Sequence, residues 1–201
     1  MKILDLKKYQ KVIKEFTGST DGPAVFVADY ASYNEGHISG TWFDLTEFDD
    51  QAEFLEKISE FFKALDKVAP LDFYRPREET MFQDYQCFPE QFYCESSIDS
   101  KLWEYLKLVD EDPDFEEIFE AYEACIGTAD DLNDVKECLF ANIKNEYPDS
   151  TASTEEKYGW WCKENGLIEI PDHIEFYFDY EAYGRDQLQN VSEHNGYIFT
   201  N

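Results

Sequence analysis

Carboxylates are the side chains through which this sequence could do most of its chemistry. Asp and Glu number 45 among 201 residues, Lys and Arg number 17, and the formal net charge is −28. The densest stretch runs from Glu104 to Glu137, where 13 acids stand beside only Lys107 and Lys136. Paired carboxylates can act as general acid and base, as in glycosidases. With so many acids, however, close pairs arise by chance, so pairing alone does not indicate such catalysis.

A calcium loop is the first specific chemistry to test against these acids. In an EF-hand loop, acids occupy positions 1, 3 and 5, glycine occupies position 6 and glutamate position 12. A loop that starts at Asp110 has acids at the first three of these positions, but Phe115 stands where glycine belongs and Ala121 where glutamate belongs. The turn residue and the bidentate ligand are both missing, so we predict no metal site.

Catalysis by other residue types has little support in the sequence. His37, His173 and His194 are the only histidines, each beside turn or helix-start residues, and no H-E-x-x-H, G-x-S-x-G or glycine-rich phosphate loop occurs. The five cysteines form no C-x-x-C pair, and their odd number disfavours a disulfide framework, so we expect reduced thiols. We therefore predict that the protein is not an enzyme and has neither catalytic residues nor a cofactor. An unrecognised Cys–His site is the alternative.

The net charge also restricts the class of partner. Nucleic acid and anionic membranes attract cations through their phosphates and repel a chain of this charge. No apolar run approaches the roughly 18 residues that a membrane-spanning helix needs. The N-terminus lacks the apolar core of a secretory signal. We predict no nucleic-acid partner, no membrane partner and a cytoplasmic location.

The linear density of the acids is similar to that of DNA. With a helical rise of about 1.5 Å per residue, residues 104–137 carry about one carboxylate per 3.9 Å, against about one phosphate per 3.4 Å of a B-DNA strand. The whole net charge equals that of about 48 Å of duplex, or about 14 base pairs. A solvated acidic face is the simplest alternative, but self-repulsion at −28 destabilises the compact state. Halophilic adaptation is a second alternative. We favour a partner built to bind phosphates.

The first 22 residues are predicted to form a basic amphipathic helix followed by a break. Residues 1–20 hold five lysines and two acids, a net charge of +3, against −31 for the rest of the chain. One helical face carries the apolar residues Leu6, Tyr9, Ile13 and Phe16. This helix either stands apart on a linker or packs on the acidic body of its own chain.

Residues 23–90 are predicted to form a small α+β domain. Residues with high β-propensity predict strands at 23–30, 37–45 and 81–88, with a turn at 33–36 after the first strand. Asp49 or Asp50 is expected to cap the helix that follows the second strand. The buried stripe of this helix is expected to comprise Phe54, Leu55, Ile58, Phe61, Phe62 and Leu65.

Residues 91–147 are predicted to form an acidic helical domain. The first helix covers residues 100–109, and the second starts at an N-cap, Asp112, and ends at Gly127. A third helix is expected over residues 130–143, with an inner face made by Leu132, Val135, Leu139 and Ile143.

Residues 148–201 are predicted to form a C-terminal α+β domain. Ser153 and Glu156 make a capping box that opens one helix, and Pro171 starts another element with Ile174, Tyr177 and Phe178 at helical offsets. Asn195-Gly196 is typical of the turn in a hairpin. Adjacent residues cannot share one helical face, so one of Trp160 and Trp161 is expected in the core and the other at a subunit interface.

Two motifs resemble those of a known family. Tyr33-Asn34-Glu35-Gly36, followed by Gly40-Thr41-Trp42-Phe43, resembles the YNEG…G-x-W-F signature of ArdA-type antirestriction proteins. Residues 179–186 (DYEAYGRD) resemble the D-Y-x-A-Y-G-R-D block of the same family. The motifs stand in the family's order and at about its separation. The resemblance covers residue 23 to the C-terminus, is weakest over 110–150, and does not extend to residues 1–20.

The resemblance implies both a fold and a function. It implies an elongated α+β chain of three small domains that is dimeric through the C-terminal one. It implies an antirestriction protein that mimics DNA, occupies the DNA-binding groove of type I restriction–modification enzymes and inhibits them competitively. Such a protein would be carried on a mobile genetic element and act in the cytoplasm of the host bacterial cell. The alternative is an acidic binding module for another basic DNA-binding partner.

The partner-binding carboxylates are expected after the second strand and in the helical domain, where they lie opposite apolar stripes. They are Asp44, Glu47, Asp49, Asp50, Glu53, Asp110, Glu111, Asp112, Asp114, Glu116, Glu117, Glu120, Glu123, Asp130, Asp131, Asp134 and Glu137.

The residues of the two motifs are expected to be structural. Glycines would meet backbone requirements, aromatic residues would pack, and Arg185 would form a salt bridge to Asp179 or Asp186 or a dimer contact. The motif residues are Tyr33, Asn34, Glu35, Gly36, Gly40, Trp42, Asp179, Tyr180, Tyr183, Gly184, Arg185 and Asp186.

Overall fold

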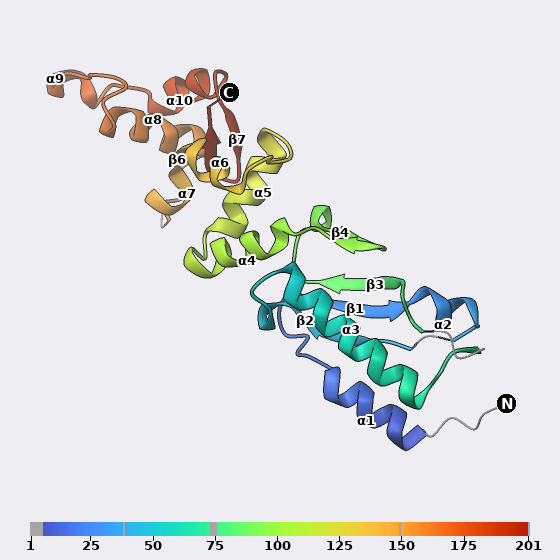
Figure 1. Ribbon diagram of the computed structural model, residues 1–201. Coiled ribbons are helices and arrows are strands. Elements are labelled where there is room, and N and C mark those ends of the chain that lie inside the picture. The colour runs from blue at the N-terminus through green and yellow to red at the C-terminus, as the bar shows by residue number, and fades with distance from the viewer. Residues whose placement is uncertain (1–5, 38, 73–75, 149, 201) are drawn as a thin grey trace. The chain divides into compact units, whose positions relative to one another are not determined.

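The chain has the predicted α+β fold, and it divides into two compact units. The computed structural model describes residues 6–37, 39–72, 76–148 and 150–200. One unit is Met1–Lys107 and the other is Leu108–Asn201 (Figure 1). Each unit is described by itself below.

The N-terminal unit is a three-stranded antiparallel sheet with helices on it. Strand β1 (Ala24–Asp29) lies between β2 (Thr41–Asp44) and β3 (Thr80–Gln86). Helix α3 (Gln51–Val68) packs on this sheet, and α1 (Leu6–Phe16) runs beside α3 (Figure 1). The remaining elements are α2 (Tyr30–Asn34), η1 (Leu45–Glu47), η3 (Glu90–Phe92), β4 (Tyr93–Cys94), β5 (Ser97–Ile98) and α4 (Lys101–Glu111), which continues across the unit boundary.

Helix α3 supplies most of the core of this unit. Asp50 caps it by accepting a hydrogen bond from the Glu53 amide at 2.9 Å, so the predicted cap is confirmed. The predicted stripe is also buried, with the Phe43 ring 6.0 Å from Phe54 and 5.6 Å from Phe61. Leu55 is the exception. It is 46% exposed, because it lies at the margin of the stripe and faces a surface pocket.

The basic helix α1 packs on its own unit, which was the second of the two predicted arrangements. The Phe16 ring lies 5.3 Å from that of Phe61, and the Lys57 ammonium group stands 5.2 Å from the centre of the Phe16 ring. After the helix, the Thr17 hydroxyl is 2.6 Å from that of Thr41, and the Gly18 amide donates to the Trp42 carbonyl at 2.9 Å. The helix and the segment after it are therefore fixed to β2 and α3.

Two predictions for this unit were partly wrong. The second strand is shorter than residues 37–45, since its pairing with β1 ends at Thr41, and Ile38 lies outside the described residues. Residues 33 and 34 of the predicted turn at 33–36 belong instead to a short helix, α2, which Asp29 caps by accepting from the Ser32 amide at 2.7 Å. Gly36 then reverses the chain with a φ of +86°.

The C-terminal unit combines a short sheet with several helices. Strand β8 (Tyr197–Phe199) lies between β6 (Leu139–Asn142) and β7 (Ser192–His194). Asn195 and Gly196 form the predicted hairpin turn, with φ of 52° and 86°. The helices are α5 (Phe115–Cys125), α6 (Leu132–Glu137), α7 (Ile143–Glu146), α8 (Thr154–Glu164), α9 (Asp172–Glu175) and α10 (Tyr180–Leu188).

The predicted helix over 130–143 was wrong in its second half. Its first half is α6, but residues 139–142 form strand β6, which pairs with β8. The apolar residues do have helical spacing. Pairing with a distant strand, however, gives the backbone groups of residues 139–142 their hydrogen bonds, and Ala141 and Ile143 are still buried. Tertiary contacts therefore override the local pattern.

Two helix starts also differ from the predictions. Helix α5 begins at Phe115, after a turn in which the Asp112 side chain accepts from the Asp114 amide at 3.1 Å, so Asp112 precedes the helix instead of capping it. The element after Pro171 is only the short α9, in which no residue is buried. A helix of this length is not stable by itself, and an ion pair from Glu175 to Lys163 joins it to α8.

Candidate functional site

The acids are concentrated in the C-terminal unit. This unit holds 24 acidic and 5 basic residues, a net charge of −19, whereas the N-terminal unit holds 21 and 12, a net charge of −9. Twelve of the predicted partner-binding acids, from Asp110 to Glu137, belong to the C-terminal unit. The other five, Asp44, Glu47, Asp49, Asp50 and Glu53, belong to the N-terminal unit.

Helix α5 presents acids along one side because its other side is apolar. Phe115, Ile118, Phe119 and Tyr122 are buried, and their helical spacing in the sequence indicates this face. On the opposite side, carboxylates recur at spacings of four and three residues, which places them on one face of the helix. The members of this acidic row are Glu116 and Glu120, which are exposed, and Glu123, which is half-buried.

Basic side chains of the C-terminal unit are mostly paired with acids. Lys136 bonds Asp112 at 2.7 Å, and Lys144 bonds Glu117. The hydrogen bond from Lys136 lowers the pKa of Asp112. Hydrogen bonds from Lys144 and then from the Tyr197 hydroxyl, which donates at 2.8 Å, lower the pKa of Glu117. Both carboxylates are therefore held ionised.

Two further ion pairs involve residues of α8, α9 and α10. Lys163 bonds Glu175, whose pKa is lowered by that bond and by the Tyr180 hydroxyl, and Arg185 bonds Glu181 at 2.8 Å. Four of the five bases of the unit are thus engaged internally. The acids outside these pairs dominate its exposed surface.

The remaining predicted acids are exposed, apart from the half-buried Asp44 and Asp112, and several also shape the backbone. Asp44 accepts from the Thr46 amide at 3.0 Å and caps η1. Asp131 accepts from the Asn133 amide at 2.9 Å and caps α6. Asp114 accepts from the side-chain amide of Asn145 at 2.6 Å. The other exposed acids are Glu47, Asp49, Asp50, Glu53, Asp110, Glu111, Asp130, Asp134 and Glu137.

In the first motif, one glycine lies where a side chain would not fit and the other has a left-handed backbone conformation. A Cβ at Gly40 would lie 2.5 Å from the Phe26 ring and from the Val27 carbonyl, and Gly36 has positive φ. Trp42 packs edge-on against Phe26 at 5.7 Å. The Glu35 carboxylate accepts from the Asp72 amide at 3.3 Å, while Tyr33 and Asn34 are exposed.

In the second motif, α10 packs closely on α8. A Cβ at Gly184 would lie 1.8 Å from the Glu155 carbonyl oxygen. Asp179 caps α10 by accepting from the Ala182 amide at 2.9 Å. The rings of Tyr180 and Tyr183 lie 4.9 and 5.6 Å from that of Phe178.

Arg185 pairs with Glu181, so the predicted salt bridge to Asp179 or Asp186 was wrong. A spacing of four residues brings two side chains together on a helix, whereas adjacent residues diverge. Asp186 is exposed. Of the two tryptophans, Trp161 is in the core and Trp160 is half-buried against Tyr147 at 5.7 Å.

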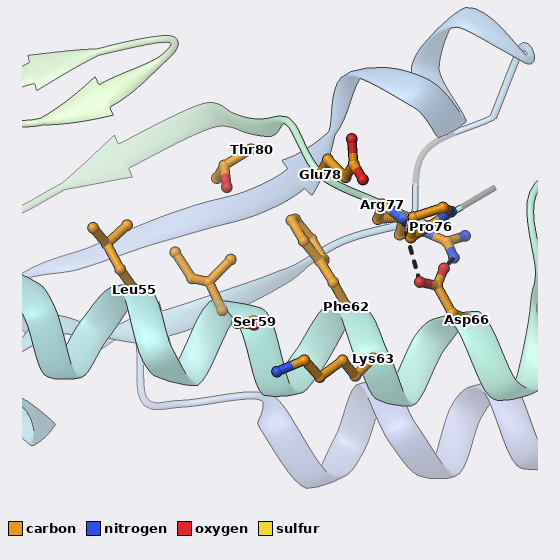
Figure 2. A pocket seen from close by; sticks show the side chains of 10 residues that line it. Leu55, Ser59, Phe62, Lys63, Asp66, Pro76, Arg77, Glu78 and Thr80 are labelled. Carbon is orange, nitrogen blue, oxygen red and sulfur yellow. Dashed lines mark hydrogen bonds and ion pairs between the residues drawn. The ribbon is translucent and has the colours of Figure 1, made fainter.

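A pocket of about 380 Å³ lies between α3 and residues 76–80 in the N-terminal unit (Figure 2). Leu55, Ile58 and Phe62 are apolar residues that line it, and Lys63 lines it as well. Neither histidine nor cysteine occurs among its described lining residues. Among the described residues, no group of three or more His, Cys, Asp or Glu is placed to hold a metal ion.

Sequence reasoning missed the buried polar network at the end of this pocket. The Arg77 guanidinium donates to Asp29 at 3.0 Å, to the Ser32 hydroxyl at 3.3 Å and to the Ala69 carbonyl at 2.8 Å, and it bonds Asp66 at 2.5 Å. The Arg77 and Asp29 side chains are fully buried. No signal in the sequence joins these residues, because Asp29 and Arg77 are 48 positions apart.

The comparison with protein families decides the family. A family model for antirestriction protein (ArdA) matches residues 25–199. The chain belongs to the ArdA antirestriction family. The match includes both motifs and begins after helix α1. A search of curated proteins found no match.

ArdA membership implies an antirestriction function and binding to restriction enzymes. The family consists of inhibitor proteins and not of enzymes. In this ArdA chain, the two motifs supply a helix cap, close glycine contacts and ring packing. Along the described residues, no helix combines the length and the apolar character that crossing a membrane requires.

Proposed function

We propose that this ArdA protein is a DNA mimic that occupies the DNA-binding groove of type I restriction–modification enzymes and inhibits them competitively. The observation that carries the proposal is the arrangement of charge in the C-terminal unit. Its acids stand on exposed helical faces and turns, while four of its five bases are already paired. A surface of this kind presents a dense anionic array with few competing cations.

The mechanism follows from the way proteins bind DNA phosphates. Lys and Arg side chains of the groove bind carboxylates as they bind phosphate oxygens, through charge-assisted hydrogen bonds. The charge of the C-terminal unit equals that of about 32 Å of duplex. Because the protein offers no base edges, its affinity is expected to be independent of the recognition sequence of the enzyme. Long-range attraction also accelerates the encounter.

Displacement of DNA tests this proposal. A fluorescent duplex bound to a purified type I enzyme should be released by increasing amounts of the protein, with an apparent affinity that falls steeply between about 50 and 200 mM salt. The same result is expected with two enzymes of different sequence specificity. Full retention of the duplex at a large excess of protein and low salt would contradict the proposal.

Single carboxylates should contribute small, similar amounts to inhibition. We expect Glu116→Gln and Glu120→Gln each to weaken DNA displacement by about 1.5- to 5-fold, because exposed ion pairs are weak individually. The double variant should multiply the two effects, since the residues act through a distributed field. Glu90→Gln, an exposed acid of the N-terminal unit outside the proposed surface, serves as the control. Abolition of inhibition by one substitution in a folded protein would contradict a distributed surface.

The proposed dimer also has a candidate contact in the C-terminal unit. Phe176 is 90% exposed and Tyr177 is 83% exposed, and their rings lie edge-to-face at 5.4 Å beside the exposed Ile174. Large apolar side chains in such a patch are typical of an interface. We propose that a second copy covers this segment, which would make a longer acidic inhibitor.

Disruption of the aromatic segment should yield monomers. In light scattering after gel filtration, the wild type is expected at the mass of a dimer and the variant Phe176→Ser/Tyr177→Ser at the mass of a monomer. Tyr33→Ser removes an exposed aromatic residue from the N-terminal unit and should leave the dimer intact. A dimer that persists in the double variant would place the interface elsewhere.

The proposed setting is the cytoplasm of a host bacterium. There the protein would be supplied by a mobile genetic element and protect the incoming DNA. Inhibition of restriction is the activity that such an element requires.

A further inference from the structure

Helix α1 carries a row of cations that the DNA-mimic proposal leaves unexplained. Lys7, Lys11 and Lys14 are exposed, and within the described part of the chain none of them forms an ion pair. At spacings of four and three residues they lie on one face, with their Cα atoms spread over about 10 Å of helix. They belong to a segment of net charge +3 in a chain of net charge −28.

This row is held in place by the rest of the N-terminal unit. The apolar face of α1 packs against α3 through Phe16, and the residues after the helix bond to Thr41 and Trp42. The lysines therefore point away from their own unit on a fixed helix. The family match covers residues 25–199, so α1 lies outside the matched part of the chain.

The acidic row of α5 has the same spacing with the opposite charge. Glu116, Glu120 and Glu123 follow one another at four and three residues, as do Lys7, Lys11 and Lys14. Two helices laid side by side in parallel would bring each lysine opposite a glutamate. We propose that the lysine row of α1 docks on the acidic row of α5 in a second copy of the chain.

Other anionic partners fit the structure less well. A helix that binds a lipid surface must insert its apolar face, but part of that face of α1 is packed against α3, where the Phe16 ring contacts Phe61. Duplex DNA would be attracted by three lysines and repelled by the acids of the whole molecule. A second copy supplies a row of matching length, sign and spacing.

The contact has a distinctive dependence on salt. At about 0.01 M salt the Debye length is about 30 Å, so the net charges of the two copies repel. At about 0.15 M it is about 8 Å, and only the facing rows are felt. At about 1 M the rows are screened as well. Association is therefore expected to be greatest at intermediate salt and, because exposed ion pairs are weak, at protein concentrations on the order of 0.1–1 mM.

Charge reversal on each side tests the proposal by sedimentation velocity at about 0.15 M salt. Reversal of α1 (Lys7→Glu, Lys11→Glu, Lys14→Glu) and reversal of α5 (Glu116→Lys, Glu120→Lys, Glu123→Lys) should each abolish concentration-dependent association beyond the proposed Phe176/Tyr177 dimer. A mixture of the two variants should associate again. The protein with both reversals has the net charge of the wild type and should also associate.

Controls separate the contact from general charge and from folding. Reversal of Lys63, Lys67 and Lys107, which are exposed and lie outside α1, adds the same negative charge and should leave association unchanged. Circular dichroism establishes that each variant is folded. Association beyond the dimer that survives either reversal, or is not restored in the mixture, overturns the proposal. So does binding of a fluorescent duplex that requires the α1 lysines, which would make the row a nucleic-acid surface.

The contact is independent of the proposed inhibition. It needs only the charged rows of α1 and α5, so it can fail while DNA displacement succeeds, and the reverse also holds. If both hold, α1 covers part of the acidic surface when the protein is concentrated and releases it on dilution.

Discussion

Replacement of Arg77 by methionine should lower the free energy of unfolding of the N-terminal unit by about 3–5 kcal/mol. The guanidinium group is buried and joins the carboxylates of Asp29 and Asp66 to the Ser32 hydroxyl and the Ala69 carbonyl. Methionine fills a similar volume but leaves the Asp29 carboxylate buried without a counter-charge. Urea denaturation followed by circular dichroism measures the loss.

A second variant separates the cost of the unpaired buried charge on Asp29 from the cost of the packing lost with the Arg77 side chain. In Asp29→Asn/Arg77→Met, the amide removes the charge but can still accept from the Ser32 amide. We expect this double variant to regain about 2 kcal/mol relative to Arg77→Met alone. Equal stability of the two variants would show that the charge of Asp29 is not what the arginine balances.

Replacement of Gly184 by alanine should destabilise the C-terminal unit by about 3 kcal/mol. The added methyl group would lie 1.8 Å from the Glu155 carbonyl oxygen and 2.9 Å from the Gly159 amide nitrogen. Both are backbone atoms of α8, so no rotamer change can relieve the overlap and the helices must separate. Gly159 is on the same crossing, since its Cβ would lie 2.2 Å from the Tyr180 carbonyl oxygen.

Thermal and urea unfolding monitored by tryptophan fluorescence measure this effect, because Trp161 of α8 lies in the core that the two helices share with the sheet. The matched control is Gly22→Ala, where a Cβ would have no atom within 4 Å. That change is expected to be neutral or slightly stabilising. An alanine at position 184 that left stability unaltered would refute the close crossing of α8 and α10.

Local sequence signals predicted those elements in which the capping or turn residues and the spacing of the apolar residues indicate the same secondary structure. The stripe and cap of α3, the buried face of α5 and the Asn195-Gly196 turn each follow from residues within one or two turns of chain. Residues 139–142 show the limit of such reasoning. Their helical pattern gives way to a strand because β8, more than 50 residues later, offers them a pairing partner.

The sequence predicts which acids form the candidate surface, but it does not predict which of them bond to other residues of the chain. The apolar face of α5 fixes which side Glu116 and Glu120 occupy, and periodicity reveals that face. The bonds of Glu117 to Lys144 and Tyr197 depend instead on the sheet that brings residues 27 and 80 positions away to α5. The Arg77 network was hidden for the same reason. Its partners come from a strand end, a short helix and the end of α3.

Zero-length carbodiimide cross-linking between the protein and a type I restriction–modification enzyme tests the central claim most directly. The account predicts amide links between carboxylates of residues 110–137 and lysines of the enzyme's DNA-binding groove, and it predicts that an excess of duplex DNA prevents them. Links confined to the N-terminal unit or to enzyme lysines outside the groove, and unaffected by DNA, would contradict it.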